Sequence, residues 1–277
     1  MFADDLKIST PVSCPADSQR LQYHLDLVCR WGVLNSLNLN SSKCQVISFT
    51  RSKSRNNFDY KIGQVTLTRA DHVKDLGVFL DEQLTFRLHI DKTVAKCRST
   101  LGLVCRFSRI FNDITLRKTL YCALVRSLLE YAAPVWSPYY DEHVKRVESI
   151  QKRFSLFALG IQRVPGTFSL APYSHRLKML DLASIEVRHK LACVTLVYDS
   201  LMGRLDSDYI RSKIVVNNNR RGRRSCYLYT EFHRTNYGRY EPINKAAELF
   251  NEVSHVFLRG LSRAGFRRGV IEYYLNN

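Results

Sequence analysis

The sequence predicts an α+β fold, in which a small sheet layer over residues 1–80 passes into an all-helical remainder. Short runs that are typical of strands lie before residue 81, around a single helix. From Asp81 onward, apolar residues recur at alternating spacings of four and three, which is the helical period. With 45% hydrophobic residues in a chain of 277, one or two domains can bury a core.

The first part of the chain carries the strand signals. Residues 5–10 alternate between apolar and polar side chains, which predicts a half-buried strand. Two prolines then mark a loop, and a helix is expected from about Asp17 because apolar side chains follow at helical spacing. A turn of short polar side chains precedes a strand at residues 44–49. Further strands are expected at residues 65–68 and 73–80.

Apolar stripes predict the helices of the second part. The first stripe runs from Ile90 to Val104, and its apolar residues are expected to be core. A second helix is expected from about Thr115 to Tyr131. Its apolar side, also expected to be core, consists of Leu116, Leu120, Leu124 and Leu128. Further helices are expected at residues 141–159, 187–201 and 243–261.

The charge balance indicates a polyanionic partner. Forty-two Lys and Arg against 25 Asp and Glu give a net charge of +17. Such a basic chain most often binds nucleic acid and less often an anionic membrane surface. The densest block, residues 211–225, is expected to be a loop. It could bind phosphate, act as a nuclear localisation signal, or be only a solvated surface. Its arginine run consists of Arg220, Arg221, Arg223 and Arg224.

Cysteine usage and hydropathy favour an intracellular chain without a membrane segment. None of the eight cysteines forms a CxxC pair, and no Cys/His group has zinc-finger spacing. The acidic start does not resemble a signal peptide, so reduced thiols are expected. The apolar run at residues 120–129 is broken by Arg126 and is too short to cross a bilayer. A nuclear location follows if the arginine run is a localisation signal.

The first five residues, Met1-Phe2-Ala3-Asp4-Asp5, carry the most specific motif. An apolar residue, Ala and two adjacent carboxylates before an apolar strand resemble the metal-binding hairpin of a reverse transcriptase palm. The segments that follow, through residues 37–49, have the order and spacing of non-LTR retrotransposon polymerases of the jockey-like kind. The resemblance covers residues 1–160, and residues 161–277 only in general character.

The resemblance implies two-metal phosphoryl transfer, in which Asp4 and Asp5 help to hold Mg²⁺. It places Lys43 near the outgoing pyrophosphate, where a protonated amine can act as general acid, and a solvated surface lysine is the alternative. It also places Gly77 near the primer grip, where a glycine lets the backbone approach the primer end. For that segment an ordinary edge strand is the alternative.

The helical part resembles the thumb of the same family through His89-Ile90, residues 131–136 and residues 151–154. Thumb helices lie against the minor groove, so basic residues away from the apolar stripe would contact the backbone of an RNA–DNA hybrid or DNA duplex. A solvated basic face is the alternative. The expected contact residues are Lys92, Lys96 and Arg98.

The resemblance divides the chain into a palm remnant at residues 1–80, a helical thumb at 81–160 and a helical C-terminal region at 161–277. A third carboxylate and the nucleotide-binding motif lie upstream of the hairpin in the family. The chain is therefore expected to be a truncated RNA-directed DNA polymerase, a nucleotidyltransferase that is inactive alone. The alternatives are a non-catalytic nucleic-acid-binding protein derived from it and a helical interaction protein. Residues 1–50 are expected to unfold more easily than the helices.

Overall fold

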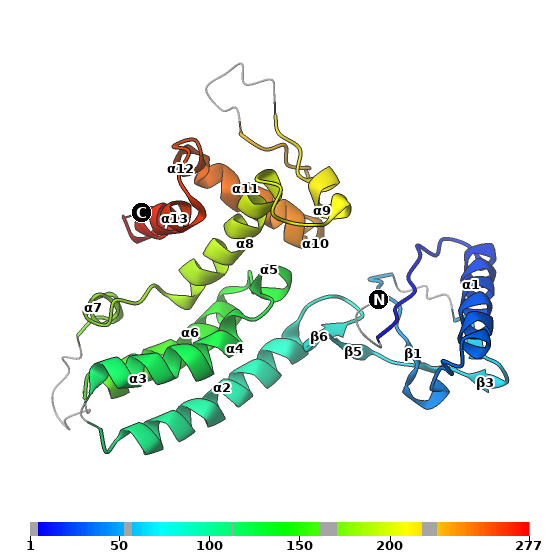
Figure 1. Ribbon diagram of the computed structural model, residues 1–277, viewed down its shortest axis with the longest axis horizontal. Helices are drawn as coiled ribbons and strands as arrows, with labels where there is room; N and C mark the ends of the chain where they lie inside the picture. Colours follow the sequence, from blue (N-terminus) through cyan, green and yellow to red (C-terminus); the bar gives the residue numbers. More distant parts are fainter. Residues whose placement is uncertain (1–4, 53–56, 112, 161–170, 218–225, 277) are drawn as a thin grey trace. The chain divides into compact units, whose positions relative to one another are not determined.

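The computed structural model describes residues 5–52, 57–111, 113–160, 171–217 and 226–276 (Figure 1). The chain divides into two compact units, Met1–His89 and Ile90–Asn277. The described part of the first unit contains a helix and small sheets, and that of the second is helical apart from one isolated bridge. The expected mixture of α and β structure is confirmed. The assignment of palm, thumb and C-terminal regions stays a prediction.

The first unit begins with helix α1 (Pro15–Leu34). Asp17 fixes its start, because one carboxylate oxygen accepts hydrogen bonds from the backbone N–H of Ser13 and Cys14 at 2.8 and 3.0 Å. These bonds lower the pKa of Asp17. Gln22 ties the helix to Lys61, donating to its carbonyl and accepting from its N–H, both at 2.9 Å. The helix is otherwise largely exposed, and Trp31 retains 55% of its accessible surface.

Within the described residues of the first unit, the strands are short and form three separate pairs. β1 runs parallel to β4, whereas β2 with β3 and β5 with β6 are antiparallel. Of the strands in these described ranges, only β5 and β6 exceed two residues. The elements are the 3₁₀ turn η1 (Ser41–Lys43), β1 (Gln45–Val46), β2 (Lys61–Ile62), β3 (Val65–Thr66), β4 (Thr68–Arg69), β5 (His72–Asp75) and β6 (Val78–Asp81).

The strand expected at residues 5–10 is absent, and this prediction was wrong. Asp5 makes one isolated bridge, and residues 6–10 have no regular secondary structure. Leu6 and Ile8 are 44% and 38% exposed. Alternation of apolar and polar residues specifies a strand only where a neighbouring strand and a core are available to receive it.

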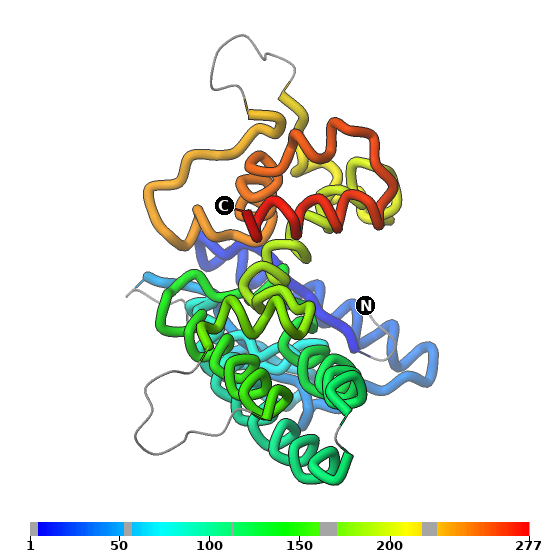
Figure 2. The backbone as a smooth tube through the Cα atoms, turned by 90° about the vertical axis from the view of Figure 1, so that its left-hand side faces the viewer, coloured from blue at the N-terminus to red at the C-terminus, as the bar shows by residue number. Residues whose placement is uncertain are grey.

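The second unit is a helical assembly (Figures 1 and 2). In both views α2, the α3–α4 run and α6 lie alongside one another. Its first helices are α2 (Arg87–Ser108, which starts in the first unit), α3 (Ile114–Tyr121), the π-helical turn η2 (Cys122–Arg126), α4 (Ser127–Glu130), α5 (Ala133–Trp136) and α6 (Asp141–Ala158). Then follow α7 (Tyr173–Met179), α8 (Ile185–Leu201), α9 (Asp208–Lys213), α10 (Asn236–Arg239), α11 (Pro242–Glu252), α12 (Ser254–Phe257) and α13 (Arg263–Asn276).

The apolar stripe of α2 is buried as expected, but the stripe of the next helix is not the expected one. Residues Ile90, Val94, Cys97, Leu101 and Val104 of α2 are all buried. In the continuous run from α3 to α4, by contrast, Leu124 is 46% exposed. The buried face is one residue further along the helix, at Arg117, Tyr121, Val125 and Leu129.

Helix α8 lies at the centre of the remaining core. It packs against α5, α11 and α13. The sequence predicted one buried stripe on this helix, but side chains are buried around most of its circumference. Its core partners include Phe250 of α11 and Phe266 of α13. The helix expected at residues 243–261 is divided into α11 and α12 and ends before Gly260, which has φ of 65°. Helix α13 was not predicted. No helix within the described residues has the length and apolar character needed to cross a membrane.

Candidate nucleic-acid interface

The carboxylate pair at the start of the chain is only partly described. Asp4 lies outside the described residues, and Asp5 has an exposed side chain. Across the described ranges, no three His, Cys, Asp or Glu side chains gather closely enough to hold a metal ion. Mg²⁺ needs several oxygen ligands around one position. The described residues by themselves therefore do not make up the Mg²⁺ site that the resemblance implies.

An ion pair joins the segment after Asp5 to the turn that carries Gly77. The ammonium of Lys7 contacts the carboxylate of Asp75, the last residue of β5. The turn to β6 consists of Leu76 and Gly77, with φ values of 43° and 88°. Two successive positive φ values are typical of a type I′ hairpin turn, where glycine is favoured. Two of the predicted site segments thus lie together, and Gly77 has a local structural reason for its identity.

Lys43 ends the 3₁₀ turn η1 and its side chain is exposed. Asn40 caps this turn, because its Oδ1 accepts hydrogen bonds from the N–H and the hydroxyl of Ser42 at 3.1 and 2.6 Å. Within the described part of the chain, no hydrogen bond or ion pair brings Lys43 to Asp5 or Gly77. Its role as a general acid stays a prediction.

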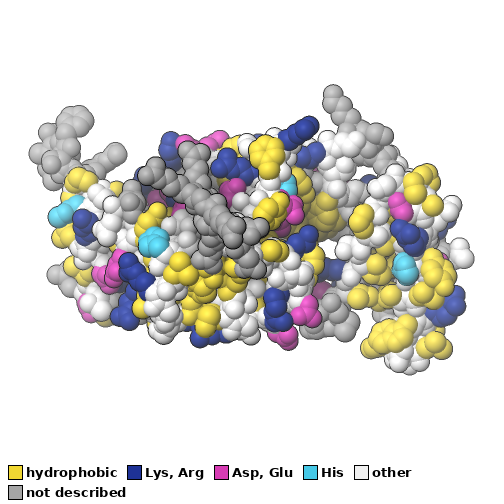
Figure 3. Space-filling view, turned by 90° about the horizontal axis from the view of Figure 1, so that it is seen from above, with side chains coloured by type: hydrophobic (Ala, Val, Ile, Leu, Met, Phe, Trp, Pro, Cys, Tyr) yellow, Lys and Arg dark blue, Asp and Glu magenta, His cyan; other side chains and the backbone are white. Residues whose placement is uncertain are grey.

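The exposed face of α2 carries the predicted basic residues. Lys92 and Lys96 are exposed, and each follows a buried residue, Ile90 or Val94, by two positions. Two positions are a rotation of about 200° around an α-helix, so these lysines lie on the side opposite the core. Arg98 is exposed on the flank of the same helix. In the face shown in Figure 3, Lys and Arg occur in both units and are interspersed with acidic side chains.

Contacts with neighbouring helices hold α2 in place. Near its start, the carboxylate of Asp91 accepts a hydrogen bond from the guanidinium of Arg146 on α6 at 2.5 Å. In its middle, Cys97 Sγ lies 3.8 Å from the carbonyl oxygen of Val125. Burial raises the pKa of Cys97 to about 12, so this thiol is uncharged at neutral pH and packs as part of the core. Lys92 and Lys96 thus lie on the exposed side of α2, and the opposite side of this helix packs against its neighbours.

The motif at residues 151–154 builds the core of the helical unit. Gln151 is fully buried, and its Oε1 accepts a hydrogen bond from the hydroxyl of Tyr121 at 3.0 Å. Its Nε2 donates to the hydroxyl of Tyr173 at 3.1 Å and to the carbonyl of Ala183 at 2.9 Å. The two basic residues of the motif, at positions 152 and 153, point outward. Through these hydrogen bonds the buried side-chain amide of Gln151 joins α3, α6 and α7.

Glu148, one turn earlier on α6, is a structural residue that the sequence did not single out. Its carboxylate accepts a hydrogen bond from the hydroxyl of Tyr173. It also accepts from the backbone N–H of Ile185 and of Glu186, each at 3.2 Å. These two N–H groups begin α8, where a negative charge is favoured by the helix dipole. No signal in the sequence distinguishes Glu148 from a surface glutamate.

The segment at residues 131–136 also has a structural explanation. Trp136 is buried, and its indole N–H donates to the carbonyl of Tyr131 at 2.7 Å. Between them, Ala132 has a φ of 52°, which reverses the chain after α4. The Trp136 ring meets the ring of His189 edge-on at 5.1 Å. His189 Nε2 lies 2.8 Å from the carbonyl oxygen of Leu129, and burial lowers the pKa of His189 to about 4.

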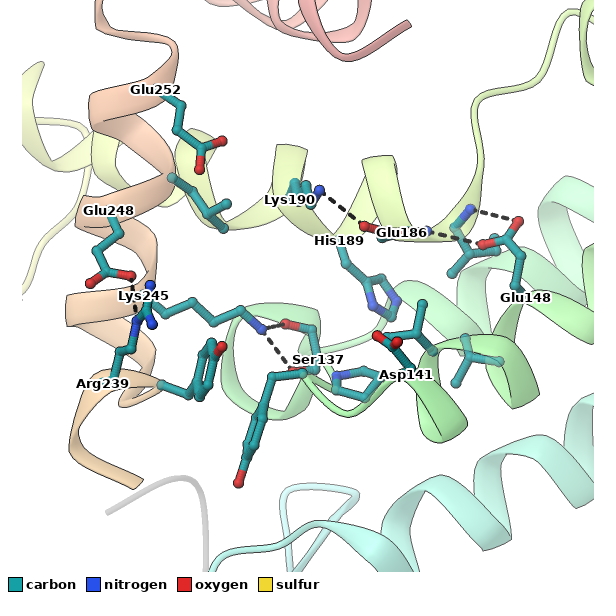
Figure 4. A pocket seen from close by; sticks show the side chains of 17 residues that line it. Ser137, Asp141, Glu148, Glu186, His189, Lys190, Arg239, Lys245, Glu248 and Glu252 are labelled. Atoms are coloured by element: carbon teal, nitrogen blue, oxygen red, sulfur yellow. Dashed lines mark hydrogen bonds and ion pairs between the residues drawn. The ribbon is translucent and has the colours of Figure 1, made fainter. Parts of the chain in front are cut away.

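A cavity of about 320 Å³ lies between the α5–α6 turn, α8 and α11. Figure 4 shows Lys245 reaching from α11 to Ser137, whose carbonyl oxygen and hydroxyl it contacts at 2.8 and 2.7 Å. Burial lowers the pKa of Lys245. Acidic side chains also line the cavity, and two are paired, Glu186 with Lys190 and Glu248 with Arg239. No pattern in the sequence predicts this cavity.

The arginine run of residues 220, 221, 223 and 224 lies outside the described residues. The loop expected from residue 211 was wrong at its start, because residues 211–213 belong to α9. Val216 then pairs with Leu228 in an isolated antiparallel bridge. Tyr227, which follows the block, packs against Phe250 and Phe257 of the core.

Comparison with known proteins identifies related polymerases. The chain is 25% identical over 166 residues to a probable RNA-directed DNA polymerase from transposon X-element of Drosophila melanogaster, covering 58% of this chain and 18% of the relative. It is 27% identical over 155 residues to the RNA-directed DNA polymerase from mobile element jockey of Drosophila funebris, covering 55% and 17%. A probable RNA-directed DNA polymerase from transposon BS of Drosophila melanogaster is 24% identical over 156 residues, with the same coverage of 55% and 17%.

The chain spans less than a fifth of the length of these relatives. No family model matches the chain, and no solved structure matches it. The resemblance found in the sequence is confirmed: over more than half of its length, the chain is similar to the RNA-directed DNA polymerases of jockey-like non-LTR mobile elements.

Proposed function

We propose that this chain is part of an RNA-directed DNA polymerase of a mobile element and that it holds an RNA–DNA hybrid or DNA duplex along the exposed face of α2. The observation that carries the proposal is the placement of Lys92 and Lys96 on the side of α2 opposite its buried stripe. The similarity to mobile-element polymerases supports it, since such enzymes act on nucleic acid.

Binding through this face is electrostatic and independent of sequence. Lysine ammonium groups on a rigid helix neutralise phosphates, and each neutralised phosphate releases condensed counterions. The net charge of +17 supplies a long-range attraction for the same partner. Affinity therefore falls steeply as the salt concentration rises, and one base sequence is bound about as well as another.

We further propose that these residues do not polymerise by themselves. In the intact polymerase Mg²⁺ would stabilise the charge that develops during phosphoryl transfer, and Asp4 and Asp5 would help to hold it. The chemistry that the resemblance implies uses a third carboxylate from an upstream strand. An intracellular location, nuclear if residues 220–224 act as a signal, belongs to the same proposal.

The test is duplex binding by the whole chain, measured by fluorescence anisotropy between about 50 and about 200 mM salt. We expect the double variant Lys92→Ala/Lys96→Ala to bind more weakly and with a shallower salt dependence. The double variant Lys145→Ala/Lys178→Ala removes two exposed lysines from α6 and α7 and is the matched control. Equal losses in both double variants would mean that only net charge matters, and the α2 interface would be wrong.

A second candidate, an interaction protein, is favoured by exposed apolar side chains where α2 ends and α3 begins. Phe107 is 67% exposed and Ile110 86% exposed. Phe111, the next residue, is 54% exposed. Exposed apolar side chains that lie together in one patch are typical of contact sites for other proteins. Absence of duplex binding even at the lowest salt concentration would favour this candidate over the nucleic-acid interface.

A further inference from the structure

Three tyrosines form a row of rings beside the cavity in the helical unit. We call Tyr139, Tyr140 and Tyr240 the tyrosine row. The rings of Tyr139 and Tyr240 are stacked, with centroids 4.2 Å apart and planes 8° from parallel. Tyr140 continues the row at 4.3 Å from Tyr139, tilted by 39°. At the other end, the guanidinium of Arg239 lies 5.7 Å from the Tyr240 ring centroid.

The row is accessible, although its members pack on one another. Tyr140 retains 52% of its accessible surface. Tyr139 and Tyr240 line the cavity of about 320 Å³. A flat ligand can therefore reach the outer ring of the row or the edges of the stacked pair from the cavity. The row comes from two places far apart in the sequence, the α5–α6 turn and the end of α10, so only the fold creates it.

The cavity beside the row presents both donors and acceptors. A protonated Lys245 has three N–H groups. Among the described residues its two hydrogen bonds both go to oxygens of Ser137, which leaves one N–H for a ligand. Asp141 and Glu252 offer carboxylate oxygens on the cavity wall (Figure 4). The edges of nucleobases carry amino donors and carbonyl or ring-nitrogen acceptors, so such a wall matches them.

We propose that the tyrosine row and its cavity form a binding site for one unpaired base of single-stranded RNA or DNA. A paired base has both faces covered by its neighbours, whereas an unpaired base can stack on an aromatic side chain. The carboxylates of the cavity wall repel phosphate, which keeps the backbone of the strand outside the cavity. This inference rests on the proposed nucleic-acid function and adds a second, base-dependent contact to it.

The test compares strands that differ only in their bases. Single strands of about eight nucleotides, with bases or with abasic spacers, carry the same phosphate charge, and RNA and DNA are measured separately. We expect the base-bearing strand to bind about five- to 150-fold more tightly than the abasic one. Tyr139→Ala should remove this difference and Tyr139→Phe should keep it. Tyr209→Ala, which removes an exposed tyrosine of α9, is the matched control.

Photocrosslinking of the unaltered chain gives a readout that no folding defect can disturb. A strand with 5-iodouracil should crosslink to the peptide that contains Tyr139 and Tyr140 or to the one that contains Tyr240. Crosslinks found only elsewhere, or equal affinity for base-bearing and abasic strands, would overturn the site. If the duplex still binds through Lys92 and Lys96 in that case, the proposed function stands. If neither duplex nor single strand binds, the proposed function fails and the site fails with it.

Discussion

Phe154 lies stacked on Tyr121, with ring centroids 3.9 Å apart and ring planes 7° from parallel. Both side chains are fully buried, so the contact joins α3 to α6 in the middle of the helical unit. The same tyrosine donates its hydroxyl proton to Gln151, one turn before Phe154. One ring face and one hydroxyl of a single residue thus fix the relative position of two helices.

Replacing Phe154 with Ala should destabilise the helical unit by about 3–5 kcal/mol, because a large buried side chain leaves a cavity that the neighbours fill only in part. Urea unfolding followed by circular dichroism measures the change. Phe107→Ala, at a side chain that is 67% exposed, is the control and should cost little. A similar small effect for both variants would show that the stack is not part of the core.

The helical unit should lose stability as the pH falls from about 6.5 toward 4. Burial lowers the pKa of His189 from 6.5 to about 4, so between these values the unfolded chain binds a proton that the folded chain does not. The contribution of neutral His189 is present above the unfolded pKa and is lost as the pH falls toward the folded value. The whole effect is about 3 kcal/mol.

His189→Gln should flatten this pH dependence of the unfolding free energy, measured by urea titrations at several pH values. His89, whose pKa is also lowered by burial, adds a dependence of the same sign. His175→Gln, at an exposed position of α7, is the matched control and should leave the slope unchanged. An unchanged slope for His189→Gln would contradict the burial of a neutral imidazole at this position.

Amide hydrogen exchange should be fast over Leu6–Thr10 and slow over residues 116–128. The first segment has no regular secondary structure, whereas the second is a continuous helical run with a buried face. Mass spectrometry of peptides from the exchanged chain measures both. Equally slow exchange in the two segments would show that Leu6–Thr10 pairs with another strand in solution.

Primer extension by the purified 277-residue chain should be undetectable with Mg²⁺ on RNA or DNA templates. The reason is the third carboxylate and the nucleotide-binding motif that the resemblance places upstream of the hairpin. A radiolabelled primer on a homopolymer template makes the assay sensitive. Templated synthesis that disappears in the Asp4→Ala variant would refute the proposal of inactivity.

Much of the helical unit could be predicted from the sequence. The stripe from Ile90 to Val104 is regular over five positions, so the helical period alone selects one buried face. Helix ends were also predictable: Gly160 follows α6 and Gly203 follows α8, with φ values of 66° and 67°. Part of the candidate interface could be predicted in the same way. The positions of Lys92 and Lys96 in the sequence place them on the side of the helix opposite the buried stripe.

The run from α3 to α4 shows where periodicity fails. The leucines from Leu116 to Leu128 recur every four residues, and so do the residues from Arg117 to Leu129 one position later. Both sets satisfy the helical pattern, and the leucines look more apolar. The neighbouring α6 decides between them, since Phe154 and Gln151 provide a stacking surface and a hydrogen bond for Tyr121. The apolar periodicity of a sequence describes one helix by itself. Which face of that helix is buried depends also on the helix that packs against it.

The sequence by itself determined the α+β class, the regular core of α2, the basic character of its other face and the similarity to mobile-element polymerases. These depend on residues close together along the chain. Tertiary structure decided which face of α3 is buried, the loss of the strand at residues 5–10, the burial of Glu148, and the meeting of Tyr139 with Tyr240. The physical reason is that each of these depends on partners far apart in the sequence, which local periodicity does not encode.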